Sequence, residues 1–390
     1  MDSAPVKILV VDDEPDLELL IRQKFRKKIR AEEVSFLFAG DGFEALEKLK
    51  NGADVDIVLT DINMPRMDGL SLLSKIQELD RMLKVVIVSA YGDMDNIRTA
   101  MNRGAFDFIT KPINFEDLEI TIEKTHVELQ ELRKASSLQI TLSALHRELE
   151  IASKIQLSSL PSKFPAFPER TDLDLYAMMI PAQEVGGDFY DFFLIDDDRL
   201  AFVLGDVSGK GIGAALVMAI TRTLIRATGL QGLASAECLS HVNRVLFPET
   251  MPRMFVTAIY GILDTRTGEV TFSNAGHHTP LIVRRNGSVE STERTGGLGL
   301  CLAPEFKYRE GRIQLERGDR LLLYTDGVTE AVNGLGEQYD DERLIGCFAD
   351  SVGEGPSEMI RDILRSVTSF SGGLIQSDDI TMLALQYNGR

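Results

Sequence analysis

The first 125 residues of the chain alternate short apolar runs with amphipathic stretches. The apolar runs cover residues 7–11, 35–38, 57–60, 85–89 and 106–110, and a helical stretch follows each of them. This alternation predicts an α/β domain with a five-stranded, doubly wound parallel sheet and helices on both of its faces. Because the carboxyl ends of parallel strands meet at one edge of such a sheet, we expect the chemistry of this domain at that edge.

Polar side chains follow or end several of these runs, namely Asp12, Asp13, Asp61, Ser89 and Lys111. Three carboxylates brought together would repel one another unless a divalent cation neutralised them, and Mg²⁺ prefers oxygen ligands plus water. A metal-bound carboxylate can attack a phosphoryl group and hold it as an acyl phosphate, while a lysine and a hydroxyl contact its oxygens. An Asp after a strand is commonly a helix N-cap, but five such residues at matching strand ends predict a Mg²⁺ site with Asp61 as the phosphate acceptor.

Residues 5–120 resemble the receiver domain of two-component response regulators. The matching segments are I-L-V-V-D-D at 8–13, L-T-D-I-N-M-P at 59–65 with D-G at 68–69, V-S-A at 88–90 and F-I-T-K-P at 108–112. The resemblance implies that Asp13, Asp61 and the backbone carbonyl of Asn63 hold Mg²⁺, and that Asp12 acts through water.

The same resemblance implies a switch that responds to phosphorylation, formed by Ser89 and Phe108 beside Lys111. Tyrosine is also common at the position of Phe108, so the phenylalanine removes a hydroxyl contact and keeps the aromatic ring. The resemblance further implies that a histidine kinase or a phosphotransfer protein donates the phosphate.

Residues 121–168 are expected to form a helical linker. No Gly or Pro occurs between Pro112 and Pro161, and four leucines follow 4-3-4 spacing: Leu138, Leu142, Leu145 and Leu149. This spacing predicts a long helix with a coiled-coil seam, and we expect a homodimer through it. The alternative is a helix that packs only on its own domain. The weak helix formers at 136–137 are where we expect a stutter or break in the seam.

After the Pro-rich stretch 161–168 the chain becomes rich in β-type segments. They cover residues 173–180, 200–205, 255–264, 269–274, 320–324 and 381–386, and helical stretches cover 213–228 and 357–370. Strands and helices in blocks predict an α+β layered sandwich over residues 169–388.

Acidic residues stand beside glycines at several strand ends of this second domain: Asp188, Asp206, Asp326 and the pair Asp378-Asp379. Carboxylates without neighbouring Cys or a paired-His motif favour Mg²⁺ or Mn²⁺ over zinc. Two such ions can acidify a water and clamp a phosphate oxygen, so the pattern predicts phosphoester hydrolysis by direct attack of water.

Two similar motifs indicate other chemistry but fit poorly. The segment G-D-V-S-G-K-G at 205–211 is one residue too short for a phosphate-binding P-loop and has no Ser or Thr after Lys210. The segment G-G-D-F-Y at 186–190 is similar to the signature of diguanylate cyclases, but Phe189 replaces the second acidic residue.

Residues 170–388 resemble PPM-type serine/threonine phosphatases of the bacterial SpoIIE-like branch, which have a layered β-sandwich flanked by helices. The matching segments are G-G-D-F-Y-D at 186–191, G-D-V-S-G-K-G at 205–211 with A-A-L at 214–216, F-V-T at 255–257, N-A-G-H at 274–277, T-D-G-V-T-E at 325–330 and D-D-I-T at 378–381. The resemblance implies two Mn²⁺ or Mg²⁺ ions bridged by Asp206. One ion would also bind Asp188 and the carbonyl of Val207, and the other Asp326 and Asp378.

Several roles in this second site stay open at the level of the sequence. Asp379 is an alternative to Asp378, and Lys210 either contacts the substrate phosphate or caps its turn. A His that serves as a candidate acid in related phosphatases is replaced here by Ser208, which leaves the proton donor unassigned. His277 and its neighbour His278 are interpreted as hydrogen-bonded structural residues.

The resemblance implies as substrate a small phosphoserine-bearing anti-sigma-factor antagonist of the STAS class. A net charge of -18, from 60 acidic and 42 basic residues, disfavours binding to nucleic acid or anionic membranes and argues against a DNA-binding regulator. Three widely spaced cysteines and the lack of an apolar leader predict a cytoplasmic protein. The alternative function is a non-enzymatic adaptor that sequesters a regulatory partner.

Overall fold

The computed structural model describes residues 5–79, 81–90, 92–247, 254–292, 295–351, 353–374 and 376–389. The chain divides into two compact units, Met1–Ala144 and Leu145–Arg390. The helix α6 (Phe115–Ser159) passes through this division, which lies inside the expected linker 121–168.

The first unit contains a five-stranded parallel sheet with the order β2-β1-β3-β4-β5, which confirms the predicted doubly wound fold. Its strands are β1 (Val6–Val11), β2 (Val34–Ala39), β3 (Ile57–Asp61), β4 (Lys84–Ala90) and β5 (Asp107–Lys111). Its further helices are α1 (Pro15–Lys24), α2 (Arg26–Arg30), α3 (Gly42–Lys50), α4 (Gly69–Gln77) and α5 (Met94–Asn102).

Side chains of the interior strand β1 alternate between two apolar cores. Leu9 packs with residues of α3 and α4 on one face of the sheet, and Ile8 packs with α1 and the start of α6 on the other. One glycine matters for the site: a Cβ on Gly69 would lie 2.1 Å from the carbonyl oxygen of Asp61. Only glycine therefore lets α4 begin so close to the end of β3.

Helix α6 is continuous over 45 residues, so the expected break at 136–137 does not occur. Leu138, Leu142 and Leu145 are 60%, 48% and 50% exposed. These three seam leucines are therefore exposed, the fourth, Leu149, is half-buried, and homodimerisation through the seam stays a prediction.

The second unit is a sandwich of two antiparallel five-stranded sheets, with the orders β13-β10-β9-β8-β7 and β12-β11-β14-β15-β6. Its strands are β6 (Leu173–Ile180), β7 (Phe189–Leu194), β8 (Arg199–Val207), β9 (Val256–Asp264), β10 (Glu269–Ala275), β11 (Leu281–Val283), β12 (Val289–Ser291), β13 (Gly311–Gln314), β14 (Arg320–Tyr324) and β15 (Ile380–Tyr387). Its helices are α7 (Ile212–Gly229), α8 (Ser235–Leu246), α9 (Asp326–Thr329), α10 (Asp340–Asp350) and α11 (Pro356–Ser371).

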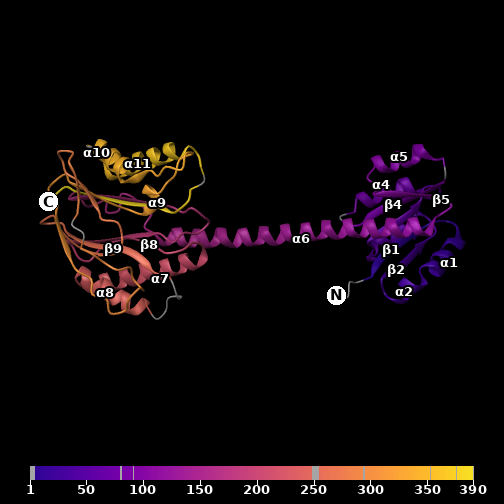
Figure 1. Cartoon of the computed structure of the whole chain (residues 1–390), viewed down its shortest axis with the longest axis horizontal. Coiled ribbons are helices and arrows are strands. Elements are labelled where there is room, and N and C mark those ends of the chain that lie inside the picture. The colour runs from indigo at the N-terminus through magenta and orange to yellow at the C-terminus, as the bar shows by residue number, and fades with distance from the viewer. Residues whose placement is uncertain are drawn as a thin grey trace. The chain divides into compact units, whose positions relative to one another are not determined.

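Helices cover the outer face of each sheet of the sandwich. Figure 1 shows α7 and α8 against the sheet that contains β8 and β9, and α10 and α11 against the other sheet. The largest apolar cluster fills the space between the sheets and beneath α7 and α8, and a second cluster lies under α10 and α11. These layers confirm the predicted flanked sandwich.

Helix α7 is the one helix among the described residues that is long and apolar enough to cross a membrane by length and composition. Met218 and Ile225 on this helix are fully buried in the core of the sandwich. Because the core helix of a globular domain meets the same criteria, this finding is weak evidence for a span.

Candidate functional site

The carboxyl ends of β1, β3 and β5 bring together the acidic and basic residues that the sequence placed there. The ammonium of Lys111 lies 2.6 Å from Oδ2 of Asp61, 3.0 Å from Oδ2 of Asp12 and 3.0 Å from Oε1 of Glu14. Glu14 was not predicted, although it directly follows the aspartate pair in the sequence. The lysine thus contacts three carboxylates at once.

A metal ion fits beside this lysine. One carboxylate oxygen from each of Asp12, Asp13 and Asp61 lies within 4.8 Å of the others. Burial raises the pKa of Asp12, although a hydrogen bond from the backbone of Glu14 and the nearby Lys111 oppose this shift. Burial also lowers the pKa of Lys111, but hydrogen bonds to the carboxylates outweigh it and raise that pKa overall, so the lysine stays charged. Hard oxygen ligands in this spacing suit Mg²⁺.

The other predicted receiver residues lie on the same part of the sheet. The backbone N–H of Asn63 donates to Oδ1 of Asp61 at 3.2 Å. Ser89 is buried at 1% exposure and donates to Oδ2 of Asp93 at 3.4 Å. Phe108 on the neighbouring strand β5 is 37% exposed, so its ring is partly open to solvent.

In the second unit, four carboxylates approach one another from the two sheets. Asp188 precedes β7 and Asp206 lies near the end of β8, whereas Asp326 follows β14 and Asp378 precedes β15. Two carboxylates therefore come from each sheet, at one edge of the sandwich.

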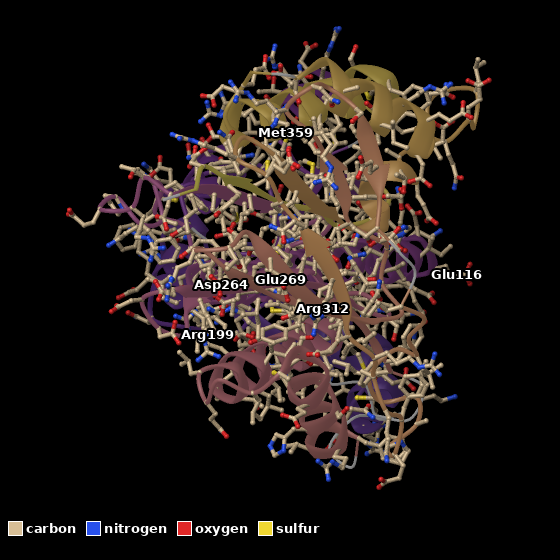
Figure 2. All side chains as sticks on the ribbon, turned by 90° about the vertical axis from the view of Figure 1, so that its left-hand side faces the viewer. Glu116, Arg199, Asp264, Glu269, Arg312 and Met359 are labelled. Atoms are coloured by element: carbon tan, nitrogen blue, oxygen red, sulfur yellow. The ribbon has the colours of Figure 1, made fainter. Side chains whose placement is uncertain are left out.

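The opposite end of the first sheet mixes acidic residues with arginines. Arg199 begins β8 and is paired in register with Asp264 at the end of β9, and Glu269 begins β10. Figure 2 shows these three residues grouped on one side of the unit, where Arg312 lies 3.7 Å from Glu269. Opposite charges are mixed there, whereas the edge with Asp206 concentrates negative charge.

Burial and mutual repulsion raise the pKa of three of these acids. Burial and the charge of Asp206 raise the pKa of Asp188 well above its ordinary value. Burial and the charge of Asp326 raise the pKa of Asp206 to about 7. Burial and the charge of Asp378 raise the pKa of Asp326. Among the described residues, only Lys210 forms a salt bridge with this set, at 3.1 Å from Asp378. Such a set favours a divalent cation as its counter-charge.

The four acids are spread more widely than those of the first unit. Among the described residues, only the Asp12, Asp13 and Asp61 group has three ligand oxygens all within 4.8 Å of one another. Val207 belongs to this edge as well, because a Cβ on Gly187 would lie 2.8 Å from its carbonyl oxygen.

The neighbours Asp378 and Asp379 have different surroundings. Oδ1 of Asp379 accepts a hydrogen bond from the backbone N–H of Ala182 at 2.8 Å, and Oδ2 accepts from the N–H groups of Gly187 at 2.7 Å and Asp188 at 3.3 Å. The side chain of Asp378 is 37% exposed and pairs with Lys210. Asp379 therefore fixes the loop that carries Asp188, and Asp378 is the more available ligand.

Further predicted residues of this domain have identifiable contacts. Lys210 contacts the carbonyl of Ser377 as well as Asp378, which ties the loop after β8 to the residues before β15. The hydroxyl of Ser208 accepts a hydrogen bond from the backbone of Phe255 at 2.9 Å. Ser208 thus holds β8 and the start of β9 together.

His277 uses both nitrogens of its ring. Nδ1 lies 2.8 Å from the hydroxyl of Thr257, and Nε2 lies 3.1 Å from the carbonyl oxygen of Tyr324. Burial and the neighbouring His278 lower the pKa of His277 to about 3. These contacts match a neutral, hydrogen-bonded histidine.

One residue of the linker helix contacts this site and was not singled out by the sequence. The side chain of Gln156 donates to the carbonyl of Gly186 at 2.6 Å and accepts from its N–H at 3.1 Å. It is the only buried side chain of α6 between residues 145 and 159. The sequence does not mark this glutamine, because its burial depends on where α6 packs on the second unit.

Comparison with known proteins yields two matching families. Residues 8–123 match the response regulator receiver domain, and residues 196–388 match Stage II sporulation protein E (SpoIIE). Protein IcfG of Synechocystis sp. is 29% identical over 268 residues, which cover 62% of this chain and 42% of IcfG. Phosphoserine phosphatase RsbU of Bacillus subtilis is 29% identical over 241 residues, which cover 61% of this chain and 70% of RsbU.

Solved structures support the fold of the second unit. The SiaA-PP2C domain of Pseudomonas aeruginosa superposes with a TM-score of 0.56 at 20% identity, and the match covers 63% of this chain and 98% of that domain. At this identity the likeness shows the fold alone. The sandwich with helices on both outer faces is therefore a PP2C-type fold.

Proposed function

The chain belongs to the response regulator receiver family through residues 8–123 and to the SpoIIE family through residues 196–388, and on this premise we propose a receiver-controlled phosphatase. Phosphorylation of Asp61 controls a metal-dependent phosphoserine/threonine protein phosphatase in the second unit. The observation that carries the proposal is the group of buried, mutually repelling carboxylates from both sheets.

The ligands that we propose for two Mn²⁺ or Mg²⁺ ions are those implied by the resemblance to SpoIIE-like phosphatases. Asp206 would bind both ions, Asp188 and the carbonyl of Val207 would bind one of them, and Asp326 and Asp378 would bind the other. Bound ions of this kind supply an acidified water and a clamp for phosphate oxygens. The chain itself holds the ligands in place, since Thr325 donates to Oδ2 of Asp188 at 2.7 Å.

In the receiver we propose that Asp13, Asp61 and the carbonyl of Asn63 hold Mg²⁺, with Asp12 acting through water. Lys111 is already within 2.6 Å of Asp61, which places its ammonium next to the oxygens of an incoming phosphoryl group. A histidine kinase or phosphotransfer protein is the proposed donor.

The proposed substrate is a phosphoserine-bearing anti-sigma-factor antagonist of the STAS type in the cytoplasm. Support comes from the resemblance to SpoIIE-like phosphatases and from RsbU, a relative whose name states activity on phosphoserine. The net charge of -18 disfavours nucleic acid and anionic membranes as partners.

The proposed path of control is helix α6, which is attached within each unit by a polar contact. In the first unit, Arg133 donates to the carboxylate of Asp56 at 2.6 Å and to the carbonyl of Met82 at 2.9 Å. In the second unit, the side chain of Gln156 forms two hydrogen bonds with the backbone of Gly186, which lies two residues before Asp188. We infer that a phosphorylated receiver repositions α6 and so moves the loop of Asp188 into the arrangement that binds metal. The exposed leucines of α6 are the proposed homodimer seam.

Hydrolysis of p-nitrophenyl phosphate with added Mn²⁺ tests the enzymatic part of the proposal. We expect turnover by the wild type and its loss in Asp206→Ala. A wild type that binds a phosphoserine protein without hydrolysing it would support the non-enzymatic adaptor instead.

The regulatory part needs a separate comparison. Wild type and Asp61→Asn are treated with a small acyl-phosphate donor and assayed on the same phosphoserine protein. We expect the donor to change only the wild-type rate, and Gln156→Ala to lose most of that change. Equal rates for wild type and Asp61→Asn with donor present would refute the coupling.

A further inference from the structure

We propose that His277 is a positioning residue that joins the two sheets of the second unit at the metal-binding edge and thereby sets the affinity of that centre for its ions. The inference rests on the proposed function, because it concerns the same four carboxylates. Under this proposal, His277 affects metal binding as well as the packing of the fold.

His277 lies where the chain crosses from one sheet to the other. β10 ends at Ala275 in the first sheet, and β11 begins at Leu281 in the second. The backbone of the crossing is fixed by Asn274, whose side chain donates to the carbonyl of His277 at 2.8 Å and accepts from its N–H at 2.7 Å. The imidazole is therefore not needed to hold its own turn.

The imidazole contacts both sheets. Thr257 belongs to β9 in the first sheet, and Tyr324 ends β14 in the second. A neutral imidazole has one N–H and one acceptor nitrogen, and a carbonyl oxygen can only accept. Nε2 of His277 therefore carries the proton and donates to Tyr324 at 3.1 Å, whereas Nδ1 accepts from the hydroxyl of Thr257 at 2.8 Å. The tautomer is assigned from these partners.

Both partners of the ring stand next to proposed metal ligands. Thr257 is the residue paired in register with Asp206 across β8 and β9. Tyr324 precedes Asp326 by two residues. The ring of His277 thus connects two residues. Thr257 is the strand partner of Asp206 in the first sheet, and Tyr324 lies two residues before Asp326 in the second. Any change in this connection alters the separation of Asp206 and Asp326.

Other contacts also connect the two sheets. The hydroxyl of Thr325 donates to Asp188 at 2.7 Å, and Lys210 joins the loop after β8 to the residues before β15. His277 adds a restraint that reaches the bridging ligand through its paired strand β9. Residues that hydrogen-bond metal ligands directly typically change metal affinity or activity by about 10–100-fold when they are replaced, and for His277, one residue further from the ligands, we take the lower end of this range.

The test compares His277→Ala and Thr257→Val with the control Thr271→Val, all in the full chain. Thr257→Val removes only the hydroxyl that donates to the ring. Thr271 lies on β10 of the same sheet and is also half-buried. Binding of Mn²⁺ is measured by calorimetry, and the heat that disappears in Asp206→Ala is assigned to this centre. The Mn²⁺ concentration for half-maximal hydrolysis is measured alongside.

We expect His277→Ala to weaken Mn²⁺ binding by about tenfold. Thr257→Val should weaken it by about threefold, because one of the two hydrogen bonds of the ring is lost. Thr271→Val should bind like the wild type. Hydrolysis at saturating Mn²⁺ should change less than the half-maximal concentration, since the ligands themselves are intact.

Wild-type Mn²⁺ affinity in both His277→Ala and Thr257→Val, with a lowered thermal midpoint only, would overturn the inference and leave a merely structural role. If His277→Ala does not fold, Thr257→Val decides the question. A wild type that binds Mn²⁺ but hydrolyses no phosphoester refutes the proposed function, while the affinities still decide the role of His277. Identical isotherms for wild type and Asp206→Ala would overturn the inference, because no centre would exist to be positioned.

Discussion

The receiver centre and the phosphatase centre both gather aspartates at strand ends, but they balance the negative charge differently. In the receiver, Lys111 contacts Asp61, Asp12 and Glu14 from within the same sheet. In the phosphatase, Asp188 and Asp206 have no salt bridge among the described residues, and their pKa values are raised. The receiver centre is thus partly neutralised by one cation of the chain, whereas Asp188 and Asp206 have no such counter-charge among the described residues.

Replacing the bridging ligand should give the largest effect. A bound ion contributes several kcal/mol to the transition state, and about 4 kcal/mol corresponds to about 10³-fold in rate, so Asp206→Asn should lower hydrolysis by about that factor. The same substitution should stabilise the chain in chelator by about 1–2 kcal/mol, because it removes a buried, repelled charge.

Urea unfolding in chelator and a phosphatase assay with Mn²⁺ measure these two effects. Asp13→Asn in the receiver is the control and should bring no comparable gain in stability, since Asp13 is exposed to solvent. A loss of stability in Asp206→Asn would break the contrast between the centres.

Metal addition should stabilise the two units unequally. At a concentration 100 times the dissociation constant, a ligand that binds only the folded state adds about 2.7 kcal/mol. We expect Mn²⁺ to slow hydrogen exchange in β8 and β14 by a corresponding factor, and Asp206→Asn to abolish this protection. Protection confined to β1 and β3 would show that only the receiver binds the ion.

Removing the ammonium of Lys111 should leave the acids of the receiver centre without a salt bridge among the described residues, as Asp188 and Asp206 are in the phosphatase centre. Lys111→Met leaves Asp12 and Asp61 without their partner, which should destabilise the receiver strands by about 2 kcal/mol in chelator. Mg²⁺ should restore most of this loss. Hydrogen exchange of β3 and β4 measures it, and an unchanged exchange rate without metal would argue against neutralisation by the lysine.

The smallest expected effect concerns pH. The pKa of His277 is lowered to about 3 in the folded chain, so the unfolded chain binds a proton more readily below the ordinary value of 6.5. Stability is therefore retained above pH 6.5 and falls as the pH decreases from there towards 3. Between pH 7.5 and 5.5 this should cost about 1 kcal/mol, which His277→Gln should not show. Urea unfolding of both proteins at the two pH values gives the difference.

The sequence predicted the receiver almost completely because its determinants are local. Strands β1 to β5 have apolar runs bounded by helices, and parallel strands must place Asp12, Asp61 and Lys111 at one edge. Glu14 was missed because its contact with the lysine depends on how α1 begins, not on any strand.

The phosphatase domain was predicted less completely. β7 was not foreseen because Asp191 interrupts its apolar run, and β11, β12 and β13 have only three or four residues each. Asp378 and Asp379 are chemically identical neighbours, and only the backbone distinguishes their roles. The contact of Gln156 with Gly186 joins residues 30 positions apart and depends on where α6 packs.

The ammonium of Lys111 has three N–H groups, and three carboxylates already surround it. Two of these N–H groups donate hydrogen bonds, to Asp61 and Glu14, and Asp12 adds an ion pair at 3.0 Å. An acyl phosphate on Asp61 would bring additional oxygens to the same ammonium and compete with these carboxylates for it. Glu14, with 67% of its side chain exposed, is the partner that water can replace most readily. Phosphorylation of Asp61 would then change the contacts at the start of α1 first, before any larger rearrangement.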